Sequence, residues 1–307
     1  MSHPPASAPS LSYEVFPPAS PQAEHAVLNT LEQLATTDPD FVSVTYSGTP
    51  ARRLATLELI HTILNQTRLR PLAHLTCVGE SAQTLTDLVR HFIGLGVRGV
   101  LAMRGDLPTD PEQERGEFPF ARYLIELIRS VEEANTASLG AGRLSIGVAA
   151  YPVRHPESPS FQHDIEVLLT KQRSGADYAI TQVYFRPEDY TQLVAAARRA
   201  GVTIPIVPGV LPVDQLPRLE RLAQLTGVAP DPLLAHALES AGSERERLSI
   251  GVDFAAKLAQ RALDDGAPGV HVYTFNRHEG PLELIERLEL PGRRLAARND
   301  WAQRVGA

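Results

Sequence analysis

The 307-residue sequence contains one cysteine, no long apolar run and no excess of positive charge, and each shortage excludes a class of protein. The single cysteine, Cys77, rules out an internal disulfide and a zinc site with several thiolates, and it is typical of a reducing cytoplasm. No apolar run approaches the roughly 20 residues that a membrane-spanning helix needs. The net charge is -7 and no cluster of Lys or Arg is present, so we expect neither a membrane nor a nucleic-acid partner.

The overall composition is that of a globular domain. Hydrophobic residues make up 43% of the chain and charged residues 21%, and 307 residues are enough for one large domain with its own core. Residues 1–10 are rich in Ser, Pro and Ala, with neither a basic start nor an apolar segment. We interpret them as a flexible N-terminal tail rather than a signal peptide, followed by a single domain over residues 11–307.

Eight short apolar runs alternate with amphipathic segments along the chain. Most runs are followed by a stretch with apolar residues three and four positions apart, which is typical of a helix. Such alternation requires crossover connections and therefore parallel strands, and eight units at this length predict a closed (β/α)8 TIM barrel in the α/β class. An open doubly wound sheet is the alternative. The predicted strands are 12–16, 41–45, 71–76, 100–103, 145–150, 178–182, 204–208 and 269–274.

The predicted helices fill the intervals, and the seventh interval, 211–268, is long enough for two or three of them. Ser243 is an expected cap for the last of these. In a barrel, the carboxyl ends of all the parallel strands lie at one rim, where enzymes of this fold have their active sites. Polar side chains gather at the predicted ends, which indicates a pocket without fixing its contents.

The segment from Val100 to Pro108 carries the most distinctive of these ends. A buried apolar strand stops at Arg104, Gly105 and Asp106, where a fixed cation and a carboxylate flank a residue without a Cβ. Taken alone, Arg104 and Asp106 are better explained by an ordinary surface ion pair. The motifs at the other predicted strand ends, however, favour a binding site at Arg104 and Asp106.

Nine short motifs, in order from residue 12 to residue 277, make the chain similar to the methylenetetrahydrofolate reductase family. The resemblance covers nearly the whole chain, and its specificity lies in the number, order and spacing of the motifs. The motifs are SYEVFPP (12–18), FVSVTY (41–46), HLTC (74–77), LAMRGDLP (101–108), GVAAYP (147–152), HPE (155–157), AITQ (179–182), IVPGVLP (206–212) and YTFNR (273–277).

The resemblance implies a TIM barrel that binds FAD and passes a hydride from NADH or NADPH, through the flavin, to 5,10-methylenetetrahydrofolate. The product would be 5-methyltetrahydrofolate, a compound of one-carbon metabolism and methionine biosynthesis. We expect the catalytic barrel alone, without a regulatory domain, in a cytoplasmic homo-oligomer. No metal is implied, and the sequence does not choose between the two nicotinamides.

The resemblance also assigns roles to two carboxyl groups. Glu14 is the expected general acid, which protonates the departing folate nitrogen and needs a pKa raised toward neutral pH. Bulky neighbours and a covered barrel mouth would supply that increase in pKa. Asp106 resembles the family carboxylate between flavin and pterin, where it would stabilise the cation formed on the substrate.

The remaining assignments concern binding. Asp164 and Lys171 are seven residues apart and therefore share a helix face, although first-turn charge and a solvated face explain them equally well. Leu216 stands where some bacterial members carry an aromatic residue, which puts the nicotinamide preference in doubt. The expected FAD contacts are Thr45, Tyr46, His74, Arg104, Gly105, Asp106, Tyr151, His155, Asp164 and Lys171, and the expected substrate contacts are Glu14, Asp106, Gln182, Leu216 and Arg277.

Two alternatives remain open at this stage. A flavin- or folate-binding barrel without turnover would bind the cofactor but would not pass electrons from nicotinamide to folate. A Schiff-base aldolase would use Lys171, although the pattern places this lysine on a helix rather than at a strand end. A colourless protein whose lysine is trapped by borohydride would favour the aldolase.

Overall fold

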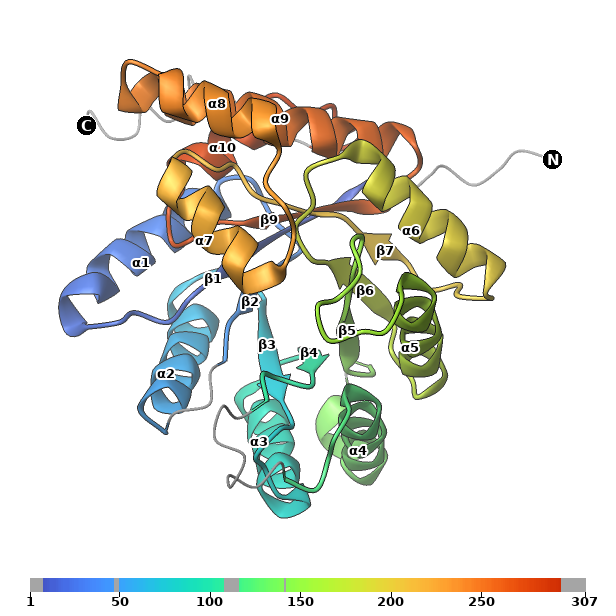
Figure 1. Cartoon of the computed structure of the whole chain (residues 1–307). Coiled ribbons are helices and arrows are strands. Elements are labelled where there is room, and N and C mark those ends of the chain that lie inside the picture. The colour runs from blue at the N-terminus through green and yellow to red at the C-terminus, as the bar shows by residue number, and fades with distance from the viewer. Residues whose placement is uncertain (1–7, 47–49, 108–115, 141, 294–307) are drawn as a thin grey trace.

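The computed structural model describes residues 8–46, 50–107, 116–140 and 142–293, and strands and helices alternate along this part of the chain (Figure 1). Most of the predicted tail, residues 1–7, lies outside the described residues, whereas Ser10 already belongs to the first strand. The strands are β1 (Ser10–Val15), β2 (Phe41–Val44), β3 (Pro71–Thr76), β4 (Gly99–Met103), β5 (Ser145–Ala150), β6 (Tyr178–Thr181), β7 (Ile206–Val207), β8 (Gly209–Val210) and β9 (Gly269–Tyr273).

The strands form one parallel sheet that closes into a barrel. Each strand pairs with its neighbour in the order β7-β6-β5-β4-β3-β2-β1-β9-β8. Only Pro208 separates β7 from β8 in the chain, so the two ends of this order are one interrupted strand that pairs with β6 on one side and β9 on the other. Proline has no N–H to donate, which explains why the predicted seventh strand is split. The (β/α)8 TIM barrel is confirmed.

The helices surround the strands, as Figure 1 shows. Three helices, α7 to α9, lie between β8 and β9, and the side chain of Ser243 caps α9 by accepting from the N–H of Glu246 at 3.1 Å, as expected. No helix in the described ranges is long and apolar enough to cross a membrane. The helices are α1 (Pro21–Ala35), α2 (Pro50–Gln66), α3 (Ala82–Leu95), α4 (Ala121–Ala134), α5 (Phe161–Arg173), α6 (Pro187–Arg199), α7 (Leu216–Thr226), α8 (Pro232–Ser240), α9 (Glu244–Asp264) and α10 (Glu279–Glu286), with a 3₁₀ turn at Thr136–Leu139 that the pattern did not predict.

Alternation along each strand separates the helix-facing core from the barrel interior. In β1, Leu11, Tyr13 and Val15 are fully buried in the large apolar core that the helices share. Ser12 and Glu14 point the other way, because successive strand side chains face opposite sides of a sheet. The strands thereby direct a second set of side chains into the interior, where the site is built.

Candidate active site

The residues predicted from the strand ends lie at one end of the barrel. Because the strands are parallel, their carboxyl ends meet at one rim and bring together side chains that are far apart in the sequence. Six strands contribute predicted residues to this rim: Glu14 in β1, Thr45 and Tyr46 after β2, His74 in β3, Arg104, Gly105 and Asp106 after β4, Tyr151 after β5, and Gln182 after β6.

Glu14 lies inside the barrel with its carboxyl group nearly removed from solvent. It is in register with Ser43 of β2 and Tyr273 of β9, and 13% of its side chain is exposed. Burial penalises the charged form and raises the pKa of Glu14 from 4.5 to about 8. The carboxyl group therefore carries a proton at neutral pH and can act there as an acid.

His74 faces the Glu14 carboxyl group from β3. Its Nε2 lies 3.5 Å from Glu14 Oε2, at the outer limit of a hydrogen bond, and has no hydrogen-bond partner among the described residues. Burial lowers the pKa of His74 to about 3, so the imidazole is neutral at pH 7. A small approach would allow the protonated carboxyl group to donate to Nε2.

A second polar pair lies one layer deeper in the barrel. Ser12 Oγ and His271 Nδ1 are 2.8 Å apart, and both residues are buried. Burial, together with the neighbouring His74, lowers the pKa of His271 to about 3. The hydroxyl of Ser43 is also buried and has no hydrogen-bond partner within the described ranges. Glu14 thus stands above a layer of polar groups that are neutral at pH 7.

Arg104 forms its ion pair with Glu157, not with Asp106. Arg104 Nη1 lies 2.7 Å from Glu157 Oε2, while Asp106 is exposed and forms no ion pair in the described part of the chain. The simpler interpretation of these two residues as a surface pair is therefore wrong. Gly105 has φ +88°, and a Cβ there would lie 3.0 Å from Cβ of Thr76, so the sharp turn after β4 requires glycine.

Four predicted residues form one cluster between β5 and α5. The rings of Tyr151 and His155 meet edge to face at 4.6 Å, and Asp164 Oδ2 accepts from the N–H of His155 at 2.9 Å. Lys171 Nζ lies 5.8 Å from the centre of the Tyr151 ring. Two of these residues on α5 and two after β5 therefore meet, as the shared helix face predicts.

Lys171 is not on a solvated helix face. The residue is 8% exposed, and its Nζ donates to the carbonyl of Ala149 at 2.9 Å. Burial lowers the pKa of Lys171 to about 8. The interpretation as a surface lysine is wrong, and the buried amine, engaged by the backbone of β5, is poorly placed to form a Schiff base with a substrate.

The aromatic side chain after β2 provides a hydroxyl without a partner. Tyr46 is 6% exposed, and its hydroxyl has no hydrogen-bond partner among the residues described. Burial raises its pKa above the ordinary value. The guanidinium of Arg53 lies 5.8 Å from the centre of its ring. Thr45 precedes it and accepts, through its carbonyl, from Thr56 Oγ1 at 2.9 Å.

The other predicted substrate contacts follow β6, β8 and β9. Gln182 follows β6 and is half-buried, with Oε1 accepting from the N–H of Val183 at 2.9 Å. Leu216 begins α7 and packs against an apolar cluster. Arg277 Nη1 lies 2.7 Å from Asp214 Oδ2, so a carboxylate of the chain already holds its guanidinium.

Residues 2–289 match the methylenetetrahydrofolate reductase family. The chain belongs to this family of oxidoreductases. It is 32% identical over 270 residues to the 5,10-methylenetetrahydrofolate reductase of Escherichia coli K12, covering 88% of this chain and 87% of the relative. It is 33% identical over 271 residues to the enzyme of the same name from Pectobacterium carotovorum, covering 88% and 86%.

Solved structures support the fold of this reductase-family chain. An uncharacterized protein from Clostridium thermocellum that binds two copies of 5-methyl-5,6,7,8-tetrahydrofolic acid superposes with a TM-score of 0.62 at 14% identity, covering 92% of this chain and 94% of that one. A dihydropteroate synthase from Xanthomonas albilineans in complex with 7,8-dihydropteroate gives 0.50 at 15% identity, covering 98% and 94%. At such low identities the likeness concerns the barrel alone.

Several groups in this reductase-family site were not identified from the sequence. Ser12 is two residues from Glu14 on the same strand face, so strand alternation could have indicated it. Glu157 lies within a family motif and was not singled out. No local pattern indicates the contact of Asp214 with Arg277 or that of His271 with Ser12, because these partners lie 63 and 259 residues away.

Proposed function

We propose that this protein reduces 5,10-methylenetetrahydrofolate to 5-methyltetrahydrofolate, with a hydride supplied by NADH or NADPH and carried by bound FAD. Family membership supports the folate reaction. The observation on which the proposal depends is the burial of the Glu14 carboxyl group, which raises its pKa, at the rim that also carries Arg104, Gly105 and Asp106. We further expect a cytoplasmic homo-oligomer that serves methionine biosynthesis, with residues 11–307 as the catalytic domain.

Glu14 is the proposed general acid. Opening the five-membered ring of the substrate breaks a carbon–nitrogen bond, and the departing nitrogen takes the proton of the Glu14 carboxyl group. Glu14 then becomes a carboxylate beside His74, whose Nε2 is 3.5 Å away. Because burial disfavours that carboxylate, Glu14 recovers a proton before the next cycle, and the acid is ready again at neutral pH.

Asp106 is the proposed electrostatic partner of the opened substrate. The ring-opened form is an iminium cation, and a carboxylate at the turn after β4 would lower its free energy. Asp106 is exposed and is not engaged by Arg104, whose ion pair is with Glu157. Its charge is therefore available to a ligand at the barrel mouth.

The residues around this mouth fit FAD. A pyrophosphate needs cations, and Arg104 and Lys171 supply two within the same cluster as Tyr151. The hydroxyl of Tyr46, which has no partner within the described ranges, offers a hydrogen bond, and Gly105 lets a ligand approach the backbone. Bound FAD would supply the hydride transfer between the nicotinamide and the folate. Thr45, His74, His155 and Asp164 complete the proposed contact set.

Gln182, Leu216 and Arg277 are the proposed contacts of folate and nicotinamide in turn, which implies a ping-pong sequence. The amide of Gln182 can both donate and accept, as the pterin edge requires. Leu216 offers apolar packing without the π face of an aromatic ring. Arg277 would have to share its guanidinium between Asp214 and a substrate carboxylate or phosphate.

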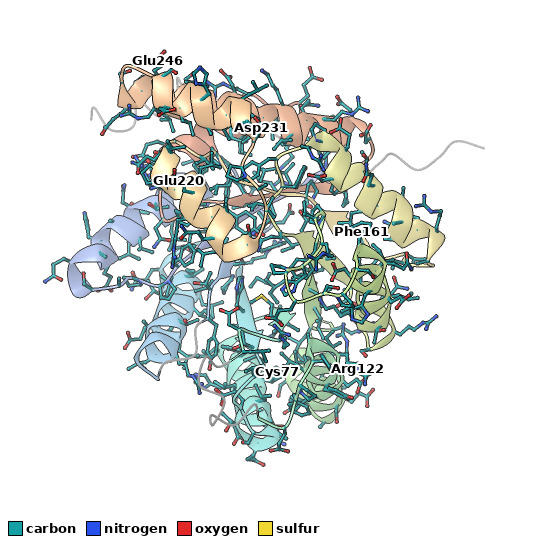
Figure 2. All side chains as sticks on the ribbon, in the orientation of Figure 1. Cys77, Arg122, Phe161, Glu220, Asp231 and Glu246 are labelled. Carbon is teal, nitrogen blue, oxygen red and sulfur yellow. The ribbon has the colours of Figure 1, made fainter. Side chains whose placement is uncertain are left out.

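The test separates the two half-reactions. The purified protein should be yellow, and anaerobic addition of NADH or NADPH should bleach the flavin, which 5,10-methylenetetrahydrofolate should then reoxidise. Glu14→Gln should retain FAD and nicotinamide-driven bleaching but lose reoxidation by folate. The matched control is Glu220→Gln, a change at an exposed glutamate of α7 (Figure 2), which should behave like the wild type. Normal folate turnover by Glu14→Gln would remove Glu14 from the mechanism. A flavin- or folate-binding barrel without turnover would show neither bleaching by the nicotinamide nor reoxidation by the folate.

A further inference from the structure

The loop after β9 has an unusual backbone. Phe275 and Asn276 have φ values of +50° and +58°, and Asp38 is the only other non-glycine residue in the described ranges with positive φ. Left-handed conformations of non-glycine residues cost free energy and persist only where the surrounding structure holds them. Two such residues in succession indicate that this loop is held in place for a reason.

The side-chain amide of Asn276 binds the backbone at the end of β1. Its Oδ1 accepts from the N–H of Phe16 at 2.7 Å, and its Nδ2 donates to the carbonyl of Phe16 at 2.9 Å. The ladder between β1 and β9 ends at Glu14, which pairs with Tyr273. The amide therefore replaces the next strand residue and fixes the chain two positions beyond Glu14.

Other contacts of the same loop converge on the same segment. Thr274 Oγ1 donates to the carbonyl of Glu14 itself at 2.6 Å and accepts from the N–H of Asn276 at 3.0 Å. The ring of Phe275 stacks on that of Phe16, with centroids 5.7 Å apart. From the buried face of α1, Thr30 Oγ1 donates to the carbonyl of Asn276 at 3.0 Å. The loop is thus anchored to a helix and bound to the backbone on both sides of Val15.

We propose that Asn276 is a positioning residue that keeps the carboxyl group of Glu14 inside the barrel and away from water. This inference rests on the proposed role of Glu14 as the acid. Without the amide, the segment that follows Glu14 would lose both hydrogen bonds of Phe16 to the loop, and water would gain access to the carboxyl group. The titratable groups that face Glu14 are His74 from β3 and Tyr273 from β9, with His271 one layer below, and none of them carries a charge at pH 7 that would oppose this change.

Asn276→Gly provides the main test, because glycine keeps the left-handed backbone and removes both hydrogen bonds to Phe16. Folate-dependent reoxidation of the reduced holoenzyme is measured from pH 6 to pH 9. In the wild type the rate should fall as pH rises through about 8, where Glu14 loses its proton. In the variant this fall should move down by one pH unit or more. A shift of one unit lowers the protonated fraction at pH 7.5 about threefold.

Asp38→Gly is the matched control. Asp38 is an exposed residue with φ +50°, so this change also places glycine at a left-handed position, but in the turn after α1. Its pH profile should match that of the wild type. Circular dichroism at each pH measures how much of the variant is folded, and a merely structural role would change that amount and leave the midpoint of the folded enzyme unchanged.

A readout without turnover keeps this inference distinct from the proposed function. Infrared difference spectra, recorded over the same pH range, follow the protonated carboxyl band that Glu14→Gln removes. The inference predicts a lower titration midpoint in Asn276→Gly, whether or not Glu14 is the acid. If that variant does not fold, Asn276→Ser adds no charge and is too short to bind both the N–H and the carbonyl of Phe16, and the same shift is expected. An unchanged midpoint in either folded variant overturns the inference, whereas a normal rate in Glu14→Gln overturns only the proposed function.

Discussion

The buried carboxyl group of Glu14 should make the folded protein less stable as the pH rises, and Glu14→Gln should remove that dependence. The pKa of Glu14 is about 8 in the folded protein and 4.5 as an ordinary exposed group. Between these values the unfolded chain has lost the proton while the folded chain keeps it. The contribution of Glu14 to stability is therefore fully present below pH 4.5 and is lost as the pH rises through 8.

The size of the effect follows from the difference in pKa. Each pKa unit corresponds to about 1.4 kcal/mol, so the contribution of Glu14 to wild-type stability should fall by about 3 kcal/mol by pH 7 and by about 5 kcal/mol above pH 9. Glutamine has nearly the shape of the protonated acid and does not ionise. Glu14→Gln should thus match the wild type near pH 4.5 and exceed its free energy of unfolding by about 3 kcal/mol at pH 7. A residue that is required for folate reduction would then be one whose loss stabilises the fold.

The free energy of unfolding is measured by urea titration of the apoproteins at pH 5, 6, 7 and 8, with circular dichroism reporting the folded fraction. His74 and His271 have lowered pKa values in the folded protein, so both lower its stability below about pH 6.5. This loss of stability is the same in wild type and variant and cancels in the difference between them. Glu220→Gln should give no difference at any of these pH values. A constant difference between wild type and Glu14→Gln over this range would show that Glu14 titrates at its ordinary pKa and would refute the reasoning.

Two further predictions test the surroundings of the site. Glu157→Gln should tighten FAD binding about two- to fivefold, because the half-exposed ion pair at 2.7 Å no longer competes for Arg104. Fluorescence titration of the apoprotein with FAD measures this affinity. Weaker binding would show that Glu157 instead helps to hold Arg104 in place for the cofactor. Gly251→Ala should destabilise the protein by about 3 kcal/mol, because a Cβ on α9 would lie 1.9 Å from the carbonyl oxygen of Val213. Gly94→Ala in α3, where a Cβ meets nothing within 4 Å, should instead raise the melting temperature slightly. Equal melting temperatures for the two variants would contradict the close packing of α9 on the backbone of Val213.

Much of the fold was readable from the sequence because its signals are local. Apolar runs such as 71–76 and 145–150 coincide with β3 and β5. The alternation of strands with amphipathic segments predicts parallel pairing whatever the details of closure. The split of the seventh strand was missed because its cause, the missing N–H of Pro208, matters only where a second strand needs that hydrogen bond. The extra helices between β8 and β9 could be counted only approximately, since their boundaries depend on packing.

The sequence by itself determined the barrel, its family and the identity of the rim residues, because the carboxyl ends of parallel strands in a barrel all lie at the same rim. The tertiary structure decided the partners and the charges. It paired Arg104 with Glu157, turned Lys171 inward onto Ala149 and attached Asn276 to Phe16, which is 260 residues away. It also removed water from Glu14, and hydration depends on everything packed around a carboxyl group and not on the residue itself.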